Sequence, residues 1–258
     1  MKWGCPQAIP LRLLAIAAVQ AFFFLPAAAA DSDAKRLASV ATDEIGKDAA
    51  LAKAAIALGR KVYAANCVAC HGADLKGVPG KHAPDLSDRV FLYGSDNVDL
   101  DPDLILASDI ESTVRFGIRA DHPNTRKLSF MPGYAGKDPK QEGGYPTLSE
   151  QDIDDLAEYL VTLQGKAGDA ARAARGKPQF MAQGCFDCHG RDAKGNPSIG
   201  ATDLTSSKYL YGADAAAIAA SIRDGRKGTS PAFEGRLAAD EIKAVAYYVF
   251  SAWEKAPK

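Results

Sequence analysis

The chain has 258 residues, of which 47% are hydrophobic and 24% charged, and its formal net charge at pH 7 is −1. Residues 1–30 contain one lysine, one arginine and no acidic residue, so the remaining 29 basic and 32 acidic residues give a formal charge of −3. This mildly acidic balance argues against nucleic acid as a partner, and the 228 residues after position 30 suffice for two domains of ordinary small size.

The first 30 residues are predicted to be a secretory signal peptide. Lys2 and Arg12 supply positive charge, Leu13 to Leu25 form an apolar run, and Ala28-Ala29-Ala30 offers a cleavage site. An uncleaved membrane anchor is the alternative, because the apolar segment is nearly long enough to cross a bilayer. We therefore expect a periplasmic mature protein without a transmembrane span, and residues 31–48 are predicted to be an N-terminal extension.

A helix over residues 49–65 is predicted to lead into the first chemical motif. The motif is Cys67-Val68-Ala69-Cys70-His71, the C-x-x-C-H pattern of c-type haem attachment. Two thiols at this spacing reach the two vinyl groups of one porphyrin and form thioethers. The histidine that follows then lies under the iron and donates an imidazole nitrogen. The sequence thus predicts a covalent haem with His71 as its proximal ligand.

The rest of the first half is predicted to enclose this haem. A loop rich in glycine and proline follows the motif, and a short helix is expected over residues 108–116. A closing helix is expected over residues 149–163, with Thr147 and Glu150 as a capping box. The first domain is therefore predicted to span residues 49–166.

The second half repeats the first. Cys185-Phe186-Asp187-Cys188-His189 matches the first motif at a shift of 118 positions, and helices are expected over residues 168–182, 213–223 and 239–253. Further matches include Asp85-Leu86 with Asp203-Leu204 and Leu92-Tyr93-Gly94 with Leu210-Tyr211-Gly212. Internal repetition favours two like domains, the second over residues 167–258. With strand signals nearly absent, the predicted fold class is all-α, with a covalent haem c and a proximal histidine, His189, in the second domain as well.

Two other interpretations of the cysteines are weaker. A zinc ribbon would pair the two C-x-x-C units, and a thioredoxin-like motif requires a βαβ setting that the sequence lacks. Two copies of the motif use four of the five cysteines, and each copy is followed by His-Gly. This pattern favours two covalently bound haem c groups.

The order of elements resembles the class I cytochrome c domain. More closely, the tandem resembles the periplasmic part of the dihaem c-type subunit of cbb-type cytochrome oxidases. The residues that carry the resemblance are Asn66 to Gly72, Phe91 to Gly94, Met131 to Tyr134, Cys185 to Gly190, Tyr209 to Gly212 and Pro231 to Phe233. The resemblance implies single-electron transfer, with a dehydrogenase, a cytochrome bc complex or a terminal oxidase as redox partner. The family has a membrane helix ahead of its haem domains, whereas here a signal peptide is predicted.

The distal ligands are expected to differ between the two haems. Met131 is predicted to ligate the first haem iron, because Met-Pro stands at the expected distance before the closing helix. The repeat aligns Met131-Pro132 with Ser230-Pro231, whereas the family has methionine at the second position. A hydroxyl is a poor iron ligand, so the second haem is expected to have water, Lys227 or no sixth ligand.

Other residues near the haems have secondary expected roles. Met181 is expected to pack on the helix before the second motif, and His82 and His122 are expected at the surface or near a propionate. Arginines precede both distal positions, where their forked donors suit haem propionates. They are Arg115, Arg119, Arg126, Arg223 and Arg226.

Three functions remain open on this basis. The first is a soluble electron carrier between a respiratory donor and a terminal acceptor, and the absence of a catalytic acid, base or nucleophile constellation favours it over an enzyme. The second is a haem enzyme, or a gas- or peroxide-binding protein, that uses an open distal site on the second haem. The third is an electron-transfer subunit of a larger oxidase or dehydrogenase. A cysteine-ligated haem enzyme is disfavoured, because no cysteine remains to be the ligand.

Overall fold

The computed structural model describes residues 27–88, 90–94, 105–127, 130–135 and 147–255. The described residues contain helices and isolated β-bridges but no strand, so the prediction of an all-α fold is confirmed. The first 26 residues of the predicted signal peptide lie outside the described residues. The helices in chain order are α1 (Ala27–Ser39), the 3-10 helix η1 (Thr42–Lys47), α2 (Ala49–Asn66), α3 (Val68–His71), α4 (Ala107–Phe116), α5 (Glu150–Leu163), α6 (Ala170–Ala182), α7 (Cys185–His189), α8 (Ala215–Asp224) and α9 (Ala239–Glu254).

Acidic and hydroxyl caps determine where several helices begin. The side chain of Asp48 accepts hydrogen bonds from the backbone of Ala50 and Leu51 at the start of α2, and Asp214 does the same for α8. The capping box of α5 is formed by Ser149 and Asp152. The predicted capping pair, Thr147 and Glu150, was therefore wrong by two residues, since the intervening Leu148 is buried in the core.

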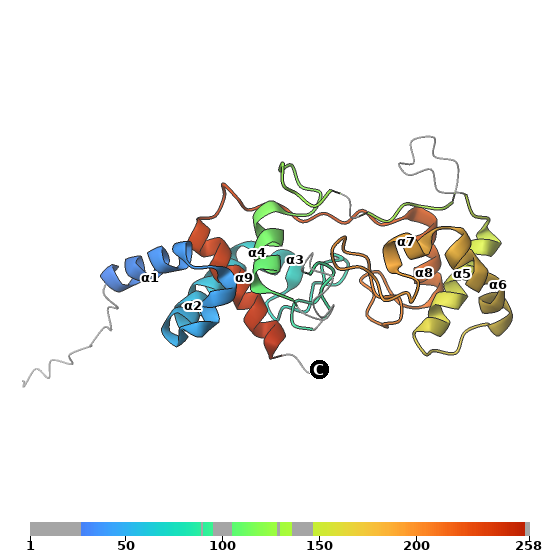
Figure 1. Ribbon diagram of the computed structural model, residues 1–258, viewed down its shortest axis with the longest axis horizontal. Helices are drawn as coiled ribbons and strands as arrows, with labels where there is room; N and C mark the ends of the chain where they lie inside the picture. Colours follow the sequence, from blue (N-terminus) through green and yellow to red (C-terminus); the bar gives the residue numbers. More distant parts are fainter. Residues whose placement is uncertain (1–26, 89, 95–104, 128–129, 136–146, 256–258) are drawn as a thin grey trace, which may run out of the picture.

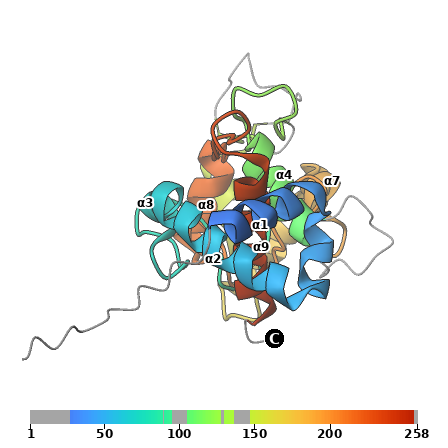
Figure 2. The same ribbon diagram turned by 90° about the vertical axis from the view of Figure 1, so that its left-hand side faces the viewer.

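The two closing helices are exchanged between the halves of the chain. Helix α9 packs on α2 and α4, where Val245 and Val249 join Val62, Tyr63 and Ile110 in one apolar cluster. Figure 1 shows the red α9 among the blue and green helices of the first half, and Figure 2 shows the same end of the molecule face-on.

Helix α5 makes the reciprocal contact. It packs on α6 and α8, and its Leu156 and Leu160 share a cluster with Phe180 and Ile218. The first unit therefore comprises α1, η1, α2, α3, α4 and α9, and the second unit comprises α5, α6, α7 and α8. The structure thus differs from two domains that are contiguous in sequence, 49–166 and 167–258, because each haem motif is covered by the closing helix of the other repeat.

Two extended segments carry the chain between the units and run antiparallel to each other (Figure 1). The first comprises residues 117–127 and 130–135, which follow α4, and the second comprises residues 225–237, which lead from α8 back to α9. Backbone hydrogen bonds join them at two places, reciprocally between Ile118 and Ser230 and reciprocally between Met131 and Arg226. We call them the first and the second crossing segment.

Ion pairs also join the two halves of the chain, through arginines at equivalent positions of the repeat. Arg223 of α8 pairs with Glu150 of α5 at 2.5 Å, and Arg115 of α4 pairs with Glu234 of the second crossing segment at 3.2 Å. Arg115 and Arg223 are equivalent in the repeat. Both arginines thus bind a carboxylate contributed by the other half of the chain, although exposed pairs of this kind contribute little to stability.

Close helix crossings at glycine give a test of the exchange. A Cβ on Gly59 of α2 would overlap the backbone carbonyl of Ala244 in α9. We expect Gly59→Val to destabilise the first unit by about 1–3 kcal/mol, because overpacking at a backbone contact forces the two helices apart. Chemical denaturation would measure the loss. Ala57→Val, on an exposed position of the same helix, is the matched control and should change stability much less. Equal effects of the two substitutions would contradict the α2–α9 contact.

Candidate haem sites

The first haem motif lies at the junction of α2 and α3. Cys67 ends α2, and His71 is the last residue of α3. The ring nitrogen Nδ1 of His71 lies 3.1 Å from the carbonyl oxygen of Pro84, to which it donates a hydrogen bond. This bond orients the ring and leaves Nε2 for a metal. Burial lowers the pKa of His71, so the imidazole is neutral and available as a ligand at physiological pH.

The second motif repeats this geometry on α7. Nδ1 of His189 lies 2.8 Å from the carbonyl oxygen of Thr202. Pro84 and Thr202 each follow their histidine by 13 residues, so the two rings are held from behind in the same way. Burial lowers the pKa of His189 too. Sequence reasoning did not identify either carbonyl, although both fall within matching parts of the repeat.

The four cysteines are free thiols and suit thioether formation. Burial raises the pKa of Cys67 and that of Cys185 to about 11 each. Redox-active C-x-x-C motifs have a lowered thiol pKa instead, which argues against a thioredoxin-like role. Among the described residues, no group of three or more histidine, cysteine or acidic side chains could hold a metal ion.

One continuous cavity of about 720 Å³ joins the two motifs. Both C-x-x-C-H histidines line it, together with apolar side chains from both units, which include Phe91, Ile110 and Ile218. A largely apolar cavity with free thiols at two places and an oriented imidazole beside each pair fits two porphyrins. The two sites therefore face a shared interior and not opposite ends of the molecule.

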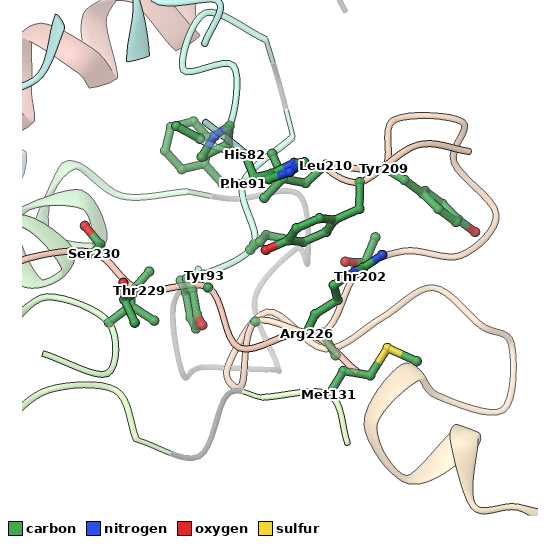
Figure 3. A pocket seen from close by; sticks show the side chains of 18 of the residues that line it. His82, Phe91, Tyr93, Met131, Thr202, Tyr209, Leu210, Arg226, Thr229 and Ser230 are labelled. Carbon is green, nitrogen blue, oxygen red and sulfur yellow. The ribbon is translucent and has the colours of Figure 1, made fainter. Parts of the chain in front are cut away.

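Met131 lies in the second unit. It packs against the cluster that contains Phe180, Cys185 and Ile218, and Tyr134 donates a backbone hydrogen bond to Ile222 in the same unit. Figure 3 shows Met131 beside the helices of the second unit. The prediction that placed Met131 over the first haem does not agree with this position, because the first crossing segment has left the first unit before it reaches Met131.

Ser230 takes the corresponding place in the first unit. Its backbone exchanges two hydrogen bonds of 2.9 Å with Ile118, and Phe233 donates to the carbonyl of Val114 in α4. The Phe233–Val114 bond is the repeat equivalent of the Tyr134–Ile222 bond. In Figure 3, Ser230 lies at the end of the pocket away from Met131. The serine therefore faces the haem site of His71, and not the site of His189 as expected.

Two of the five arginines expected near propionates are engaged elsewhere. Arg115 and Arg223 form the ion pairs with Glu234 and Glu150 that were described above. The other three remain at the cavity and its rim. Arg119 and Arg226 line it, and the guanidinium groups of Arg126 and Arg226 stack on the rings of Tyr93 and Tyr211, at 4.8 Å and 4.3 Å from the ring centroids.

Of the remaining candidate ligands, His82 and Lys227 line the shared cavity, whereas His122 and Met181 are not among its lining residues. Nε2 of His122 donates to Glu234 at 3.0 Å, and its Nδ1 accepts from the backbone of Asn124. His82 is exposed and stacks on Tyr211 at 4.9 Å, two residues from the carbonyl of Pro84 that holds the proximal ring. Met181 is 39% exposed on α6. The Nζ atom of Lys227 lies 5.0 Å from the ring centroid of Phe130.

The loops that follow the two motifs also touch each other. Gly94 donates a backbone hydrogen bond to Pro197 at 3.2 Å, and Lys208 pairs with Asp88 at 3.4 Å. A Cβ on Gly200 would overlap the ring of Tyr93, which therefore lies directly against the second unit. Together with the crossing segments, these contacts hold the two haem sites next to each other. Contacts between two such loops cannot be predicted from a single sequence.

Two family models match the chain, one in each half. A family model described as "Cytochrome c" matches residues 56–164, and one described as "Cytochrome C oxidase, cbb3-type, subunit III" matches residues 171–249. None of the described helices is long and apolar enough to cross a membrane.

Curated relatives match across both halves. The chain is 36% identical over 215 residues to the cbb3-type cytochrome c oxidase subunit FixP of Bradyrhizobium sp. (strain ORS 278), with coverage of 83% of this chain and 67% of the relative. It is 36% identical over 218 residues to subunit CcoP of Azospirillum sp. (strain B510), with the same coverage. It is 33% identical over 201 residues to subunit CcoP of Rhodobacter capsulatus, with coverage of 75% and 61%.

Proposed function

Since the chain belongs to the family of the dihaem c-type subunits of cbb3-type cytochrome c oxidases, we propose that it carries single electrons between a respiratory donor and a terminal acceptor. The observation that supports this function best is the shared cavity, because it brings two haem attachment motifs to one interior. Attached haem c supplies an iron that takes up and releases one electron at a time. Two such centres side by side make a relay.

The side chains around the cavity orient and shield the two sites. The carbonyls of Pro84 and Thr202 fix the proximal imidazoles of His71 and His189. Met131 is the residue that would supply a thioether to a haem at the second site, and such a ligand would stabilise the ferrous state. Tyr93 and Tyr211 fill the space between the units, each under an arginine that is placed to balance propionate charge.

The place of action is proposed to be the periplasm. Lys2 and Arg12, the apolar run from Leu13 to Leu25 and Ala28-Ala29-Ala30 support export. Helix α1 begins at Ala27 and so continues across the expected cleavage point. The electron donor and the electron acceptor are both proposed to be redox proteins. The leading candidate for the acceptor is the core of a cytochrome c oxidase, the kind of enzyme that the relatives' names describe.

Removal of single haems tests the relay. We expect wild-type protein to take up two electrons per chain in a reductive titration. Cys67→Ala/Cys70→Ala and Cys185→Ala/Cys188→Ala should each take up one, because each double substitution removes one pair of thioethers. Haem content by the pyridine haemochrome method should fall by half in both variants. Extraction of haem from the wild type by acid acetone, which leaves thioethers intact, would contradict covalent attachment. Uptake of two electrons by either variant would contradict the assignment of one haem to each motif.

A further inference from the structure

We propose that the haem attached at Cys67 and Cys70 has an open distal face at Ser230, which takes a small neutral diatomic ligand of the carbon monoxide and nitric oxide class. The inference rests on the proposed haem attachment and adds a ligand site to the electron relay. It also assigns this site to the haem of the N-terminal motif, although the serine stands in the C-terminal repeat.

The backbone around Ser230 holds the position of an axial ligand. The second crossing segment enters the first unit through the paired bonds between Ser230 and Ile118 and the bond from Phe233 to Val114. The first crossing segment enters the second unit through the equivalent bonds, between Met131 and Arg226 and from Tyr134 to Ile222. Because the two frames match bond for bond, Ser230 stands over the His71 site as Met131 stands over the His189 site. At this position the two frames differ in the side chain, which is a hydroxyl at Ser230 and a thioether at Met131.

In the described residues, the other methionine and histidine side chains outside the motifs lie elsewhere or make other contacts. The sequence contains three methionines, Met1, Met131 and Met181. Met131 is held in the second unit, and Met181 lies on α6 of that unit with 39% of its surface exposed. Of the two histidines outside the motifs, His122 is bound to Glu234, and the ring of His82 lies against the ring of Tyr211, with the centroids 4.9 Å apart.

Lys227 is a weaker candidate on geometric grounds. Its side chain is exposed, and its Nζ atom lies over the ring of Phe130 in a cation–π contact, 5.0 Å from the ring centroid. An ammonium has no lone pair for iron. Ligation by Lys227 would require loss of both the proton and the ring contact.

The walls of the first site favour a neutral ligand. Apolar side chains from α4, the crossing segments and α9 line the cavity there, among them Val114, Ile118, Phe233 and Val249. Transfer of an anion into such surroundings is costly, whereas a diatomic gas loses little solvation. The polarity of a distal pocket and its steric access decide whether a haem binds ligand or only transfers electrons. The hydroxyl of Ser230 is also positioned to donate a hydrogen bond to a bound ligand.

Carbon monoxide titration of the reduced dihaem protein tests the site. We expect one carbon monoxide per chain in the wild type and none in Ser230→Met, which places a thioether in the matching frame and should give a second low-spin haem. The matched control is Ser230→Ala, which lacks both the hydroxyl and a ligand and should still bind one. Azide at the same concentration should leave the spectrum of the oxidised wild type unchanged.

The single-haem variants show which haem binds the gas. Cys185→Ala/Cys188→Ala, which keeps the first haem, should bind carbon monoxide, and Cys67→Ala/Cys70→Ala should not. Binding by the second variant alone would overturn the assignment. Two low-spin haems and no binding in the wild type would overturn the open site, and recovery of binding in Lys227→Ala would then identify the lysine as the ligand.

The count of covalent haems in the same samples separates the two proposals. A chain with two haems that take up electrons but bind no carbon monoxide keeps the electron relay and loses the ligand site. A chain without covalent haem would contradict both proposals.

If a single-haem variant fails to fold, Met131→Ala in the dihaem protein replaces it. It should raise the stoichiometry from one carbon monoxide per chain to two. An unchanged stoichiometry of one would contradict methionine ligation at the second site, and no binding in either protein would contradict the open first site.

Discussion

Replacement of Met131 by alanine is expected to convert the haem at Cys185 and Cys188, and not the haem at Cys67 and Cys70, to a high-spin, ligand-accepting state. The thioether lies in the apolar cluster of the second unit, in register with Arg226. Its loss should lower the potential of the second haem by on the order of 0.1 V or more, a fraction of the ~0.8 V over which axial ligation tunes haem potentials. Loss of the far-red methionine–iron band and a potentiometric titration would measure the effect.

The single-haem background makes this test decisive. In Cys67→Ala/Cys70→Ala, which keeps the second haem, Met131→Ala should abolish the low-spin spectrum. In Cys185→Ala/Cys188→Ala, which keeps the first haem, the same substitution should leave the spectrum unchanged. Met181→Ala is the control in both backgrounds, because that side chain is partly exposed on α6. The opposite pattern would return Met131 to the first haem and would contradict the exchange of closing helices.

The second large effect is expected from a pair of equivalent core residues. Leu156 of α5 and Val245 of α9 are each 1% exposed and occupy matching places in the repeat, at a shift of 89 positions. Leu156→Ala should cost about 2–5 kcal/mol, and Val245→Ala roughly 2 kcal/mol, because each leaves a cavity in a closed core. The exchanged packing predicts that the damage appears in the other repeat, with α6 and α8 loosened by Leu156→Ala and α2 and α4 loosened by Val245→Ala.

Hydrogen exchange followed by mass spectrometry resolves this crossover without reference to the haems. Peptides from residues 49–66 should exchange faster in Val245→Ala, and peptides from residues 170–182 should exchange faster in Leu156→Ala. Asp240→Ala, on the first turn of α9 and outside the buried core, serves as a control with little effect on either set. Faster exchange of 49–66 in Leu156→Ala would mean that each closing helix covers its own repeat.

Much of the molecule was predictable from residue pattern alone. The two C-x-x-C-H motifs predict both attachment sites and both proximal histidines, because thioether and imidazole chemistry demands that spacing. Helical periodicity placed α2, α4, α5, α8 and α9 within a few residues of their observed bounds. The contrast between Met131 and Ser230 was also visible, since aligned repeats show substitutions at equivalent positions.

Only the tertiary structure decided in which unit Met131 and Ser230 each lie. An apolar stripe on a helix identifies a face that must be buried, but it does not identify the partner. The stripes of α5 and α9 are equivalent, so either helix can close either unit. Closing a longer loop costs little additional entropy. The short separation in sequence between a closing helix and its own repeat therefore does not force the helix to pack there. The crossing segments then add a reciprocal backbone ladder that contiguous domains would lack. The sequence by itself therefore determined the chemistry of each site and the asymmetry between them, whereas packing between helices distant in sequence decided which site has the methionine.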